Sequence, residues 1–452
     1  MFTIWKKLKK DKRGDALLFV IIFGFLAVTL IISSISSYSL LENRAANKKY
    51  NSNLSFHIAE AGVNYYRWHL AHNQNDYSDG GVEQENYIHE YYDKNGSLLG
   101  YFSLQIDEPL AGSSVVTIRS TGWVVGDEKN DRTIQVRLGF PSLTDYTFLS
   151  NAEMSFGFTT EVSGPVHSNG EIRFDGTSDS WVDSHVRVTG GGGPKSFWRY
   201  PVAFIDFDTI TSDLSGLQDL GNESDGKYLA SSGAEGWHIV FLGDNYELYR
   251  VLTRNCYEGE GRWRHKPWQG WYWDGDNYCY DVASEEFVEN FSLPANGVIF
   301  SEDNVWVDGV VDGRVTVAVG RFPVQSPYKN IIISDNLVYN EKGSDDVIGL
   351  LAQGNIFVSH DTPDYMEINS ALLSQYEGIS RPYYYDDIKN SLTILGSQIS
   401  YEGGGWKYVS GWGNVISGYE NTYHSYDGNL KYYPPPGFPV ETNYELISWE
   451  ET

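Results

Sequence analysis

The chain begins with a short basic segment that leads directly into a long apolar run. Five lysines and one arginine lie within the first 13 residues, and residues 16–35 are almost all apolar. A helix needs about 20 apolar residues to cross a hydrocarbon core of about 30 Å. The basic flank is expected to stay in the cytoplasm. The pattern therefore predicts one transmembrane helix over 16–35, with the rest of the chain outside the cytoplasmic membrane.

Three interpretations of this segment are open. A cleaved secretory signal would have a shorter apolar core followed by small residues, and Ser33 and Ser34 fit the second requirement. An uncleaved signal anchor fits both the length and the flanking charge. In the third interpretation a peptidase cuts before the apolar run, between Gly14 and Asp15, so that the mature chain begins at Asp15.

The apolar run continues into a second, amphipathic pattern without a break. Leu54, Ile58, Ala61, Tyr65 and Trp68 follow one another at spacings of three or four, and the chain has no proline before residue 109. This spacing places them on one face of a helix. The sequence predicts a continuous helix over 15–71, with an apolar first half and an amphipathic second half.

The remainder of the chain has the short, alternating patterns of β-structure. Lys94-Asn95-Gly96 is a hairpin turn signal, and apolar residues alternate with polar ones around Ile118 and Val136, which predicts a small antiparallel sheet module over 72–142. Short apolar segments separated by Gly, Asn and Ser then recur over 143–200 and 296–452. They favour a parallel β-helix, with a sandwich or jelly roll as the alternative.

Residues 201–295 lack this repeating pattern of short apolar segments and are predicted to form an α+β insertion. Residues 204–220 have a helical pattern, and residues 238–242 and 246–251 have the pattern of a hairpin. The predicted fold class is therefore mainly β with one long N-terminal α-helix: a helix plus a small sheet, followed by a parallel β-helix that carries the insertion.

Three short strings in the N-terminal helix resemble a known family. Residues 13–18 (RGDALL), 43–46 (NRAA) and 59–62 (AEAG) are similar to the PilX-type minor pilins of type IV pili, and the resemblance covers about residues 6–70. It implies that residues 1–14 are a prepilin leader, cut between Gly14 and Asp15 by a prepilin peptidase. It also implies methylation of the new amino group and a filament or membrane packing surface on the apolar half, made by Leu17, Leu18, Phe19, Ile22, Phe25 and Leu26.

Two residues depart from the pattern of the major pilins. Major pilins carry glutamate at the fifth mature position, where this chain has Phe19, and Asp15 is an unusual first mature residue. A buried carboxylate is costly unless it is paired, so its absence removes one docking constraint and favours a minor subunit. The string at 165–170 (PVHSNG) and the proline-rich 434–439 also resemble a domain often fused to PilX-like N-termini.

Composition narrows the class of partner. The formal net charge of −27 argues against a nucleic-acid partner, because phosphate binding needs clustered Lys and Arg. The two cysteines, Cys256 and Cys279, flank a loop rich in Trp and are expected to form a disulfide outside the cell. The loop's aromatic rings are expected to make a small core of their own, with an adhesive surface as the alternative. The segment 274–277 (DGDN) contains two aspartates but lacks the further ligands of a calcium loop, so no metal site is expected.

The sequence contains little that predicts catalysis. His360, Asp361 and Asp364 lie close together, but capping of a turn is the favoured role for these side chains. No Gly-x-Ser-x-Gly elbow, His-Glu-x-x-His helix or Walker loop is present. We expect neither an enzyme nor a cofactor.

These observations combine into one functional expectation and two alternatives. The chain is expected to be a type IV pilus-associated minor pilin-like protein at the cell surface, which takes part in pilus assembly or displays its β-rich domain for adhesion. Its expected partners are the membrane, the prepilin peptidase, other pilins with their assembly machinery, and surface or host ligands. The alternatives are a membrane-anchored structural surface protein and, less favoured, a β-helical enzyme acting on polysaccharides.

Overall fold

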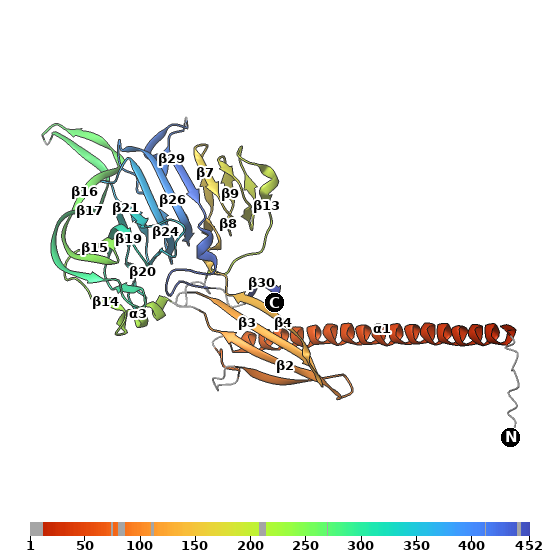
Figure 1. Cartoon of the computed structure of the whole chain (residues 1–452). Coiled ribbons are helices and arrows are strands. Elements are labelled where there is room, and N and C mark those ends of the chain that lie inside the picture. Colours follow the sequence, from red (N-terminus) through yellow and green to blue (C-terminus); the bar gives the residue numbers. More distant parts are fainter. Residues whose placement is uncertain are drawn as a thin grey trace, which may run out of the picture. The chain divides into compact units, whose positions relative to one another are not determined.

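The computed structural model describes the chain apart from residues 1–11, 74–75, 80–85, 110–112, 208–213, 269, 412 and 441–443, and it describes the side chains from residue 17 onward. The chain divides into two compact units. The first comprises residues up to 108, 116–137 and 446–452, and the second comprises 109–115 and 138–445. Each unit is described separately below (Figure 1).

The first unit consists of one long helix and a small sheet. Helix α1 (Lys12–His72) is continuous. The sheet has the strand order β1-β2-β3-β4-β30, with antiparallel pairing in β1–β2 and β2–β3. The strands are β1 (Tyr87–Tyr92), β2 (Leu98–Asp107), β3 (Val115–Val124), β4 (Asp127–Gly139) and β30 (Glu445–Glu451).

The second half of α1 packs closely on this sheet. Ile58, Ala59 and Tyr66 are fully buried. A Cβ atom at Gly122 of β3 would lie 2.4 Å from both the carbonyl oxygen of Ser55 and the backbone nitrogen of Ala59. Glycine at this position therefore lets the helix backbone approach the strand more closely than any side chain would allow.

Strand β30 corrects one predicted domain boundary. The sequence pattern assigned all of 296–452 to the β-helix, but residues 445–451 form the last strand of the small sheet. The backbone N–H of Thr452 donates to the carbonyl of Thr133, 3.1 Å away, and Arg132 forms an ion pair with Glu451. Strand pairing is non-local, so a short strand with a weak polar–apolar alternation does not reveal its partner in sequence. The second unit is thus an insertion within the chain of the first.

The second unit is a parallel β-helix, which excludes the sandwich alternative. One ladder of parallel strands runs along its length. In spatial order its members are β14 (Lys227–Leu229), β18 (Val298–Ser301), β20 (Arg314–Val319), β22 (Val347–Ala352), β24 (Tyr365–Ser374), β26 (Ile388–Ser400), β5 (Phe148–Ser150), β8 (Val166–Ser168), β11 (Val182–Ser184) and β13 (Trp198–Arg199).

Further parallel ladders form the other faces. One contains β15 (Gly236–Gly243), β19 (Val305–Val311), β21 (Ile331–Tyr339), β23 (Ile356–Val358), β25 (Ile379–Ser380) and β27 (Gly404–Gly405). Another continues from β24 and β26 to β29 (Val415–Ser425), β7 (Thr160–Ser163) and β10 (Thr177–Ser178), and β28 (Lys407–Val409) pairs antiparallel with β29. A three-stranded sheet contains β6 (Met154–Phe156), β9 (Ile172–Phe174) and β12 (Val188–Thr189).

We call each coil of the β-helix a rung. The order of the rungs in space differs from their order in the chain. Residues 148–199 stack beyond β26, where Leu149 of β5 pairs with Ile399. The chain then continues at the opposite end of the ladder, with helix α3 (Leu214–Asn222) and β14. The described residues of the unit also form three short 3₁₀ turns: η1 (Leu143–Asp145), η2 (Lys195–Phe197) and η3 (Gly428–Lys431).

The predicted insertion over 201–295 is smaller in the structure. Strands β14 and β15 belong to the parallel ladders, so residues 227–243 are a rung of the β-helix. Their rung pairs with β18 and β19, which lie about 70 residues later in the chain, and local pattern does not contain that information. The true excursion is one long hairpin of β16 (Asn245–Lys266) and β17 (Gly270–Ser292), which projects beyond the stacked strands (Figure 1).

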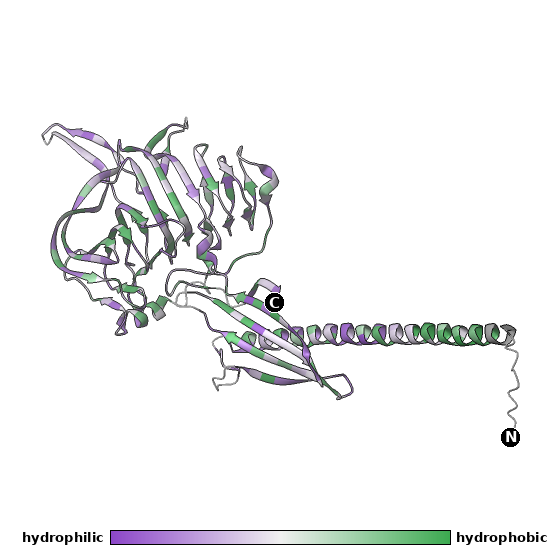
Figure 2. Ribbon diagram, viewed as in Figure 1, coloured by the Kyte–Doolittle hydropathy of each residue, from purple (hydrophilic) through white to green (hydrophobic). Residues whose placement is uncertain are grey.

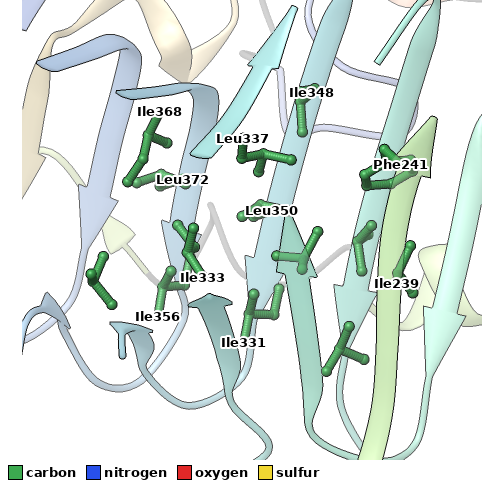
Figure 3. Close-up of a cluster of buried hydrophobic side chains, with 14 of the residues drawn as sticks. Ile239, Phe241, Ile331, Ile333, Leu337, Ile348, Leu350, Ile356, Ile368 and Leu372 are labelled. Carbon is green, nitrogen blue, oxygen red and sulfur yellow. The ribbon is translucent and has the colours of Figure 1, made fainter. Parts of the chain in front are cut away.

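The interior of the β-helix is a continuous apolar stack (Figure 3). Ile239, Val307 and Ile333 come from successive rungs of one ladder and are fully buried. Leu350 faces them from β22. The strands of the first ladder are also covered on their outer face, where Val298, Phe300 and Leu351 pack with α3 residues Leu214 and Leu217. Because these strands are buried on both faces, their sequences are unbroken apolar runs and do not alternate between apolar and polar residues.

Candidate functional site

The first half of α1 exposes an apolar surface on all sides. The residues predicted to pack in a membrane or filament are between 50% and 72% exposed: Leu17, Leu18, Phe19, Ile22, Phe25 and Leu26. Figure 2 shows the hydrophobic stretch along this part of the helix. In the described part of the chain, α1 is the one helix long and apolar enough, by length and composition, to cross a membrane. An exposed apolar surface of this extent requires cover by lipid or by another protein.

The hydroxyl group of Thr29 in this half is satisfied within the helix. Residues 16–41 contain no charged side chain. The hydroxyl of Thr29 donates to the carbonyl oxygens of Phe25 and Leu26, at 3.0 and 2.9 Å. A polar group that is satisfied within the helix costs little in an apolar environment.

The second half of α1 has the opposite surroundings. Asn51 donates to Asp127 at 2.7 Å, and Arg132 donates to the hydroxyl of Ser52 at 2.8 Å. Near the end of the helix the hydroxyl of Tyr66 donates to the carbonyl of Asp76 at 2.8 Å. One helix therefore combines a half that is held by its own sheet with a half that is held by nothing in the described chain.

The predicted cleavage site lies near the start of the described residues. Gly14 and Asp15 belong to the backbone of α1, which begins at Lys12. The rest of the predicted leader, residues 1–11, lies outside the described part of the chain. Phe19, which stands at the fifth position after Gly14, is 61% exposed.

The two cysteines are joined in a disulfide. Cys256 of β16 and Cys279 of β17 link the two strands of the long hairpin where they leave the β-helix. Beyond this link Trp263, Trp268 and Trp271 are 47%, 98% and 68% exposed. The expectation that these rings form a small core of the loop is therefore wrong. A two-stranded ribbon has no second layer to bury them.

The side chains singled out as catalytic alternatives are used in local structure. Nδ1 of His360 lies 2.7 Å from Oδ1 of Asp361, and the Tyr257 hydroxyl donates to Oδ2 of the same carboxylate at 2.6 Å. Asp364 is separate, with its carboxylate 70% exposed and 4.0 Å from Nζ of Lys389. Contacts to the Tyr257 hydroxyl and His360 offset burial and lower the pKa of Asp361.

Asp281 is a residue of this cluster that the sequence did not indicate. Its two carboxylate oxygens accept the backbone N–H groups of His360 and Asp361, at 3.1 and 2.7 Å. Burial raises the pKa of Asp281, against the opposing effect of these two hydrogen bonds. The residue lies on the hairpin 79 positions before His360, so no local signal connects the two. The arrangement fixes the hairpin to the turn at 359–362.

A second buried group lies on the wall of the β-helix. His238 of β15 stands between Glu285 and Asp308, with Nδ1 and Nε2 at 2.7 and 3.0 Å from their carboxylates. Burial disfavours the charged imidazole, but the hydrogen bonds to Asp308 and Glu285 outweigh this effect and raise the pKa of His238 to about 9. The three residues come from β15, β17 and β19, and only the fold brings them together.

Two further side chains belong to the local structure: His167, from the string at 165–170, and Asp274, from the segment 274–277. His167 is buried, and burial lowers its pKa. Asp274 pairs with Arg264 across the hairpin. Among the residues that the structure describes, no group of three His, Cys, Asp or Glu side chains is arranged to hold a metal ion.

Comparison with known proteins gives little further information. No protein-family model matches the chain, and no curated protein matches it. Among solved structures, the crystal structure of the competence-associated pilin ComZ from Thermus thermophilus is similar at 12% identity and a TM-score of 0.29. The match covers 89% of this chain and 97% of that one.

Proposed function

We propose that the chain is a minor pilin-like subunit of a type IV pilus or a related machine. The observation that carries the proposal is the division of α1 into an uncharged, exposed first half and a second half packed on a small antiparallel sheet. This combination suits a subunit whose apolar half is covered by lipid before assembly and by the helices of neighbouring subunits in the filament. The β-helix would then be displayed at the cell surface for assembly or adhesion.

The length of α1 distinguishes a pilin-like subunit from a plain anchor. A plain anchor needs only a spanning segment of about 20 residues. Here the helix continues without interruption from the apolar segment onto the small sheet of the first unit, so the anchor and that sheet share one helix. A neighbour that positions the apolar half in a filament would therefore also position the sheet.

Phe19 supports a minor rather than a bulk role. A carboxylate at this place would need a partner when it enters an apolar interior, because an unpaired buried charge is strongly unfavourable. Phe19 carries no such requirement. The subunit would then depend less on a neighbour's amino terminus, which suits a rare subunit at a tip or a priming site.

We also propose that the β-helix acts by contact and not by catalysis. His360 and Asp361 are occupied by Tyr257 and by the turn contacts to Asp281. Asp364 lies apart from them in solvent. The test measures the turnover of polysaccharides by the unaltered chain and by D361A. Turnover by the unaltered chain that is lost in D361A would overturn this part of the proposal.

The test of the assembly role is the mature amino terminus. The full chain is expressed in membranes with and without an active prepilin peptidase, and its N-terminal peptide is identified by mass spectrometry. We expect a chain that begins at Asp15, with one methyl group on its amine, only where the peptidase is present. G14V should block the cut.

G24V is the matched control, because a Cβ atom at Gly24 meets nothing within 4 Å. Its processing should equal that of the unaltered chain. A leader that stays intact beside an active peptidase would overturn the pilin proposal and favour a membrane-anchored surface protein.

A further inference from the structure

The outer end of the β16–β17 hairpin has two chemically different faces. We call residues 261–273 the tip of the hairpin. Residues directly opposite one another in an antiparallel ribbon share a face, and neighbours along a strand alternate between faces. Trp263 pairs with Trp273, and Arg264 pairs with Tyr272. The two pairs therefore point to opposite sides of the ribbon.

One face of the tip is aromatic. Trp263 and Trp273 meet edge to face with ring centroids 5.6 Å apart, and His265 and Trp271 meet at 5.1 Å. Trp268 lies in the turn that joins the strands and is 98% exposed. Together these rings form an indole-rich surface that continues onto the apex.

The other face is basic. Arg262, Arg264 and Lys266 alternate with the aromatic residues of β16, so all three leave the ribbon on the side opposite Trp263. Nζ of Lys266 lies 4.4 Å from the centroid of the Tyr272 ring. Within 261–273 every charged residue is basic. Asp274, which is opposite Arg262 and paired with Arg264, adds one carboxylate to this face, so three cations stand against one anion.

Glycines let the aromatic face lie flat on the ribbon. Gly261 and Gly275 are directly opposite. A Cβ atom at Gly261 would lie 2.6 Å from the Cα of Gly275 and 2.8 Å from the Trp273 ring. The indole of Trp273 occupies the space that side chains at this pair would fill, so the pair of glycines positions it.

The hairpin is held firmly below the tip. The disulfide joins its strands. The Tyr257 ring stacks on His360 with centroids 3.7 Å apart, and the backbone N–H of Tyr385 donates to the carbonyl of Glu258 at 2.8 Å. Trp273 also contacts Tyr385, with centroids 4.9 Å apart. A fixed hairpin loses little conformational freedom when its tip binds, which favours binding.

We propose that this tip docks on an anionic lipid surface. Aromatic and basic side chains leave opposite faces of the ribbon, so a chain-like ligand lying along one face would contact only one set. A headgroup layer that surrounds an inserted tip contacts both. Trp and Lys or Arg are the side chains favoured at the boundary between headgroups and acyl chains.

The open edges of the ribbon limit the depth of insertion. Among the described residues of the tip, the strands pair with each other, so each strand has unpaired backbone groups on its outer edge. Such groups are not tolerated in hydrocarbon, where water is absent. Docking is thus restricted to the hydrated interface, and the basic face selects negatively charged headgroups. This inference does not depend on the assembly role of α1.

The test uses the full chain held by α1 in nanodiscs of neutral lipid. The loaded nanodiscs are mixed with separate vesicles of phosphatidylcholine alone or with phosphatidylglycerol, and co-flotation is measured. We expect co-flotation with the anionic vesicles and only background with the neutral ones. Salt at about 1 M, where the Debye length is about 3 Å, should abolish it.

Charge variants separate the tip from general electrostatics. The triple variant R262Q/R264Q/K266Q should weaken partitioning about 100-fold, at about 1 kcal/mol for each cation near the surface. The control R173Q/R187Q/K342Q removes three exposed cations from the same unit. It makes the same change in net charge and should partition like the unaltered chain.

Aromatic variants test the second face. W268A/W271A should weaken partitioning roughly 10-fold through lost apolar contact, while F158A, which removes a 78% exposed ring elsewhere in the unit, should have no effect. Equal partitioning of the two charge triples would overturn the proposal. Retention of the unaltered chain by an acidic polysaccharide, with none on anionic vesicles, would overturn it in favour of a glycan ligand.

Discussion

The first half of α1 and the interior of the β-helix are both strongly apolar, but they differ in what covers them. Leu26 in the helix is 51% exposed, while Leu350 in β22 is fully buried. The β-helix completes its own interior by stacking rungs from distant parts of the chain. The helix leaves its apolar surface to another molecule. An apolar residue thus stabilises the fold in one region and stays exposed on the surface of the chain in the other.

The difference within α1 alone makes the same point. The second half of the helix buries Ile58 and Tyr66 on its own sheet, while the first half buries none of its large apolar side chains from residue 17 onward to Leu41. The helix is continuous across both halves. Helix formation and burial are therefore separate consequences of the sequence. Only burial determines which half of α1 keeps an exposed apolar surface.

The largest predicted effect comes from exchanging leucine for alanine in both regions. L350A should lower the free energy of unfolding of the β-helix by about 2–5 kcal/mol, through lost burial and a residual cavity. L26A should leave that free energy unchanged. Urea denaturation followed by tryptophan fluorescence measures both. Similar losses in the two variants would contradict the distinction between self-covered and externally covered apolar surface.

The second prediction places a charge in the apolar half. F25R should disfavour membrane insertion by about 2.5–3.5 kcal/mol, the cost of arginine near the centre of a spanning helix. The fraction of chain resistant to alkaline extraction from membranes measures insertion. S36R, at the end of the predicted span, is the control and should cost much less because its guanidinium can reach the interface. Unfolding of the β-helix should be the same in both variants.

The sequence was sufficient for the features that depend on local pattern. The absence of proline and the spacing from Leu54 to Trp68 predicted the helix, and the short apolar segments predicted the rungs of the parallel β-helix. Both patterns are local, because helix and strand periodicities appear within a few turns or residues. The role of Leu17 and Phe19 in packing stays a prediction, as does the cut at Gly14.

The features that depend on non-local pairing could not be predicted. Strand β30 pairs with β4 although most of the second unit lies between them in sequence, and the residues of β15 pair with residues of β19 that come 68 positions later in the chain. The exposure of Trp268 was also missed, since aromatic residues are usually buried and nothing in the loop's composition shows that it lacks a covering layer. Asp281 and His238 acquire their partners in the same non-local way.

The third prediction concerns a buried charge beside the apolar interior. His238 has a pKa of about 9 in the folded chain, above the ordinary value of 6.5. Its contribution to stability is complete below about pH 6.5 and is lost as pH rises through about 9. The loss should approach about 3 kcal/mol. The measurement is urea unfolding of the β-helix between pH 6 and pH 10.

The control for this prediction is H238N, which removes the titrating group but keeps a polar side chain between Glu285 and Asp308. The pH dependence of the variant reports all other groups, and the difference from the unaltered chain reports His238. Parallel pH profiles for the two chains would show that folding does not raise the pKa of the imidazole. The apolar helix α1 has no such group between residues 16 and 41, so insertion should show no matching pH step.

The smallest predicted effect tests the outer surface of the β-helix. Nε of Arg199 donates to Oδ1 of Asp183 at 2.7 Å, and its guanidinium carbon lies 4.3 Å from the centroid of the Trp181 ring. Lysine can replace neither the paired hydrogen bonds nor the planar stacking. R199K should therefore lower the free energy of unfolding by about 1 kcal/mol or less, since the side chain is about half exposed to solvent.

R173K is the matched control, because Arg173 pairs with Asp175 through one nitrogen and its side chain is 68% exposed. It should have no measurable effect on unfolding in urea. R199K could instead lower the free energy of unfolding as much as L350A does. The charged pairs on the outer surface would then stabilise the β-helix as strongly as its apolar interior. Burial of the apolar interior would then account for only part of the free energy of unfolding of the β-helix.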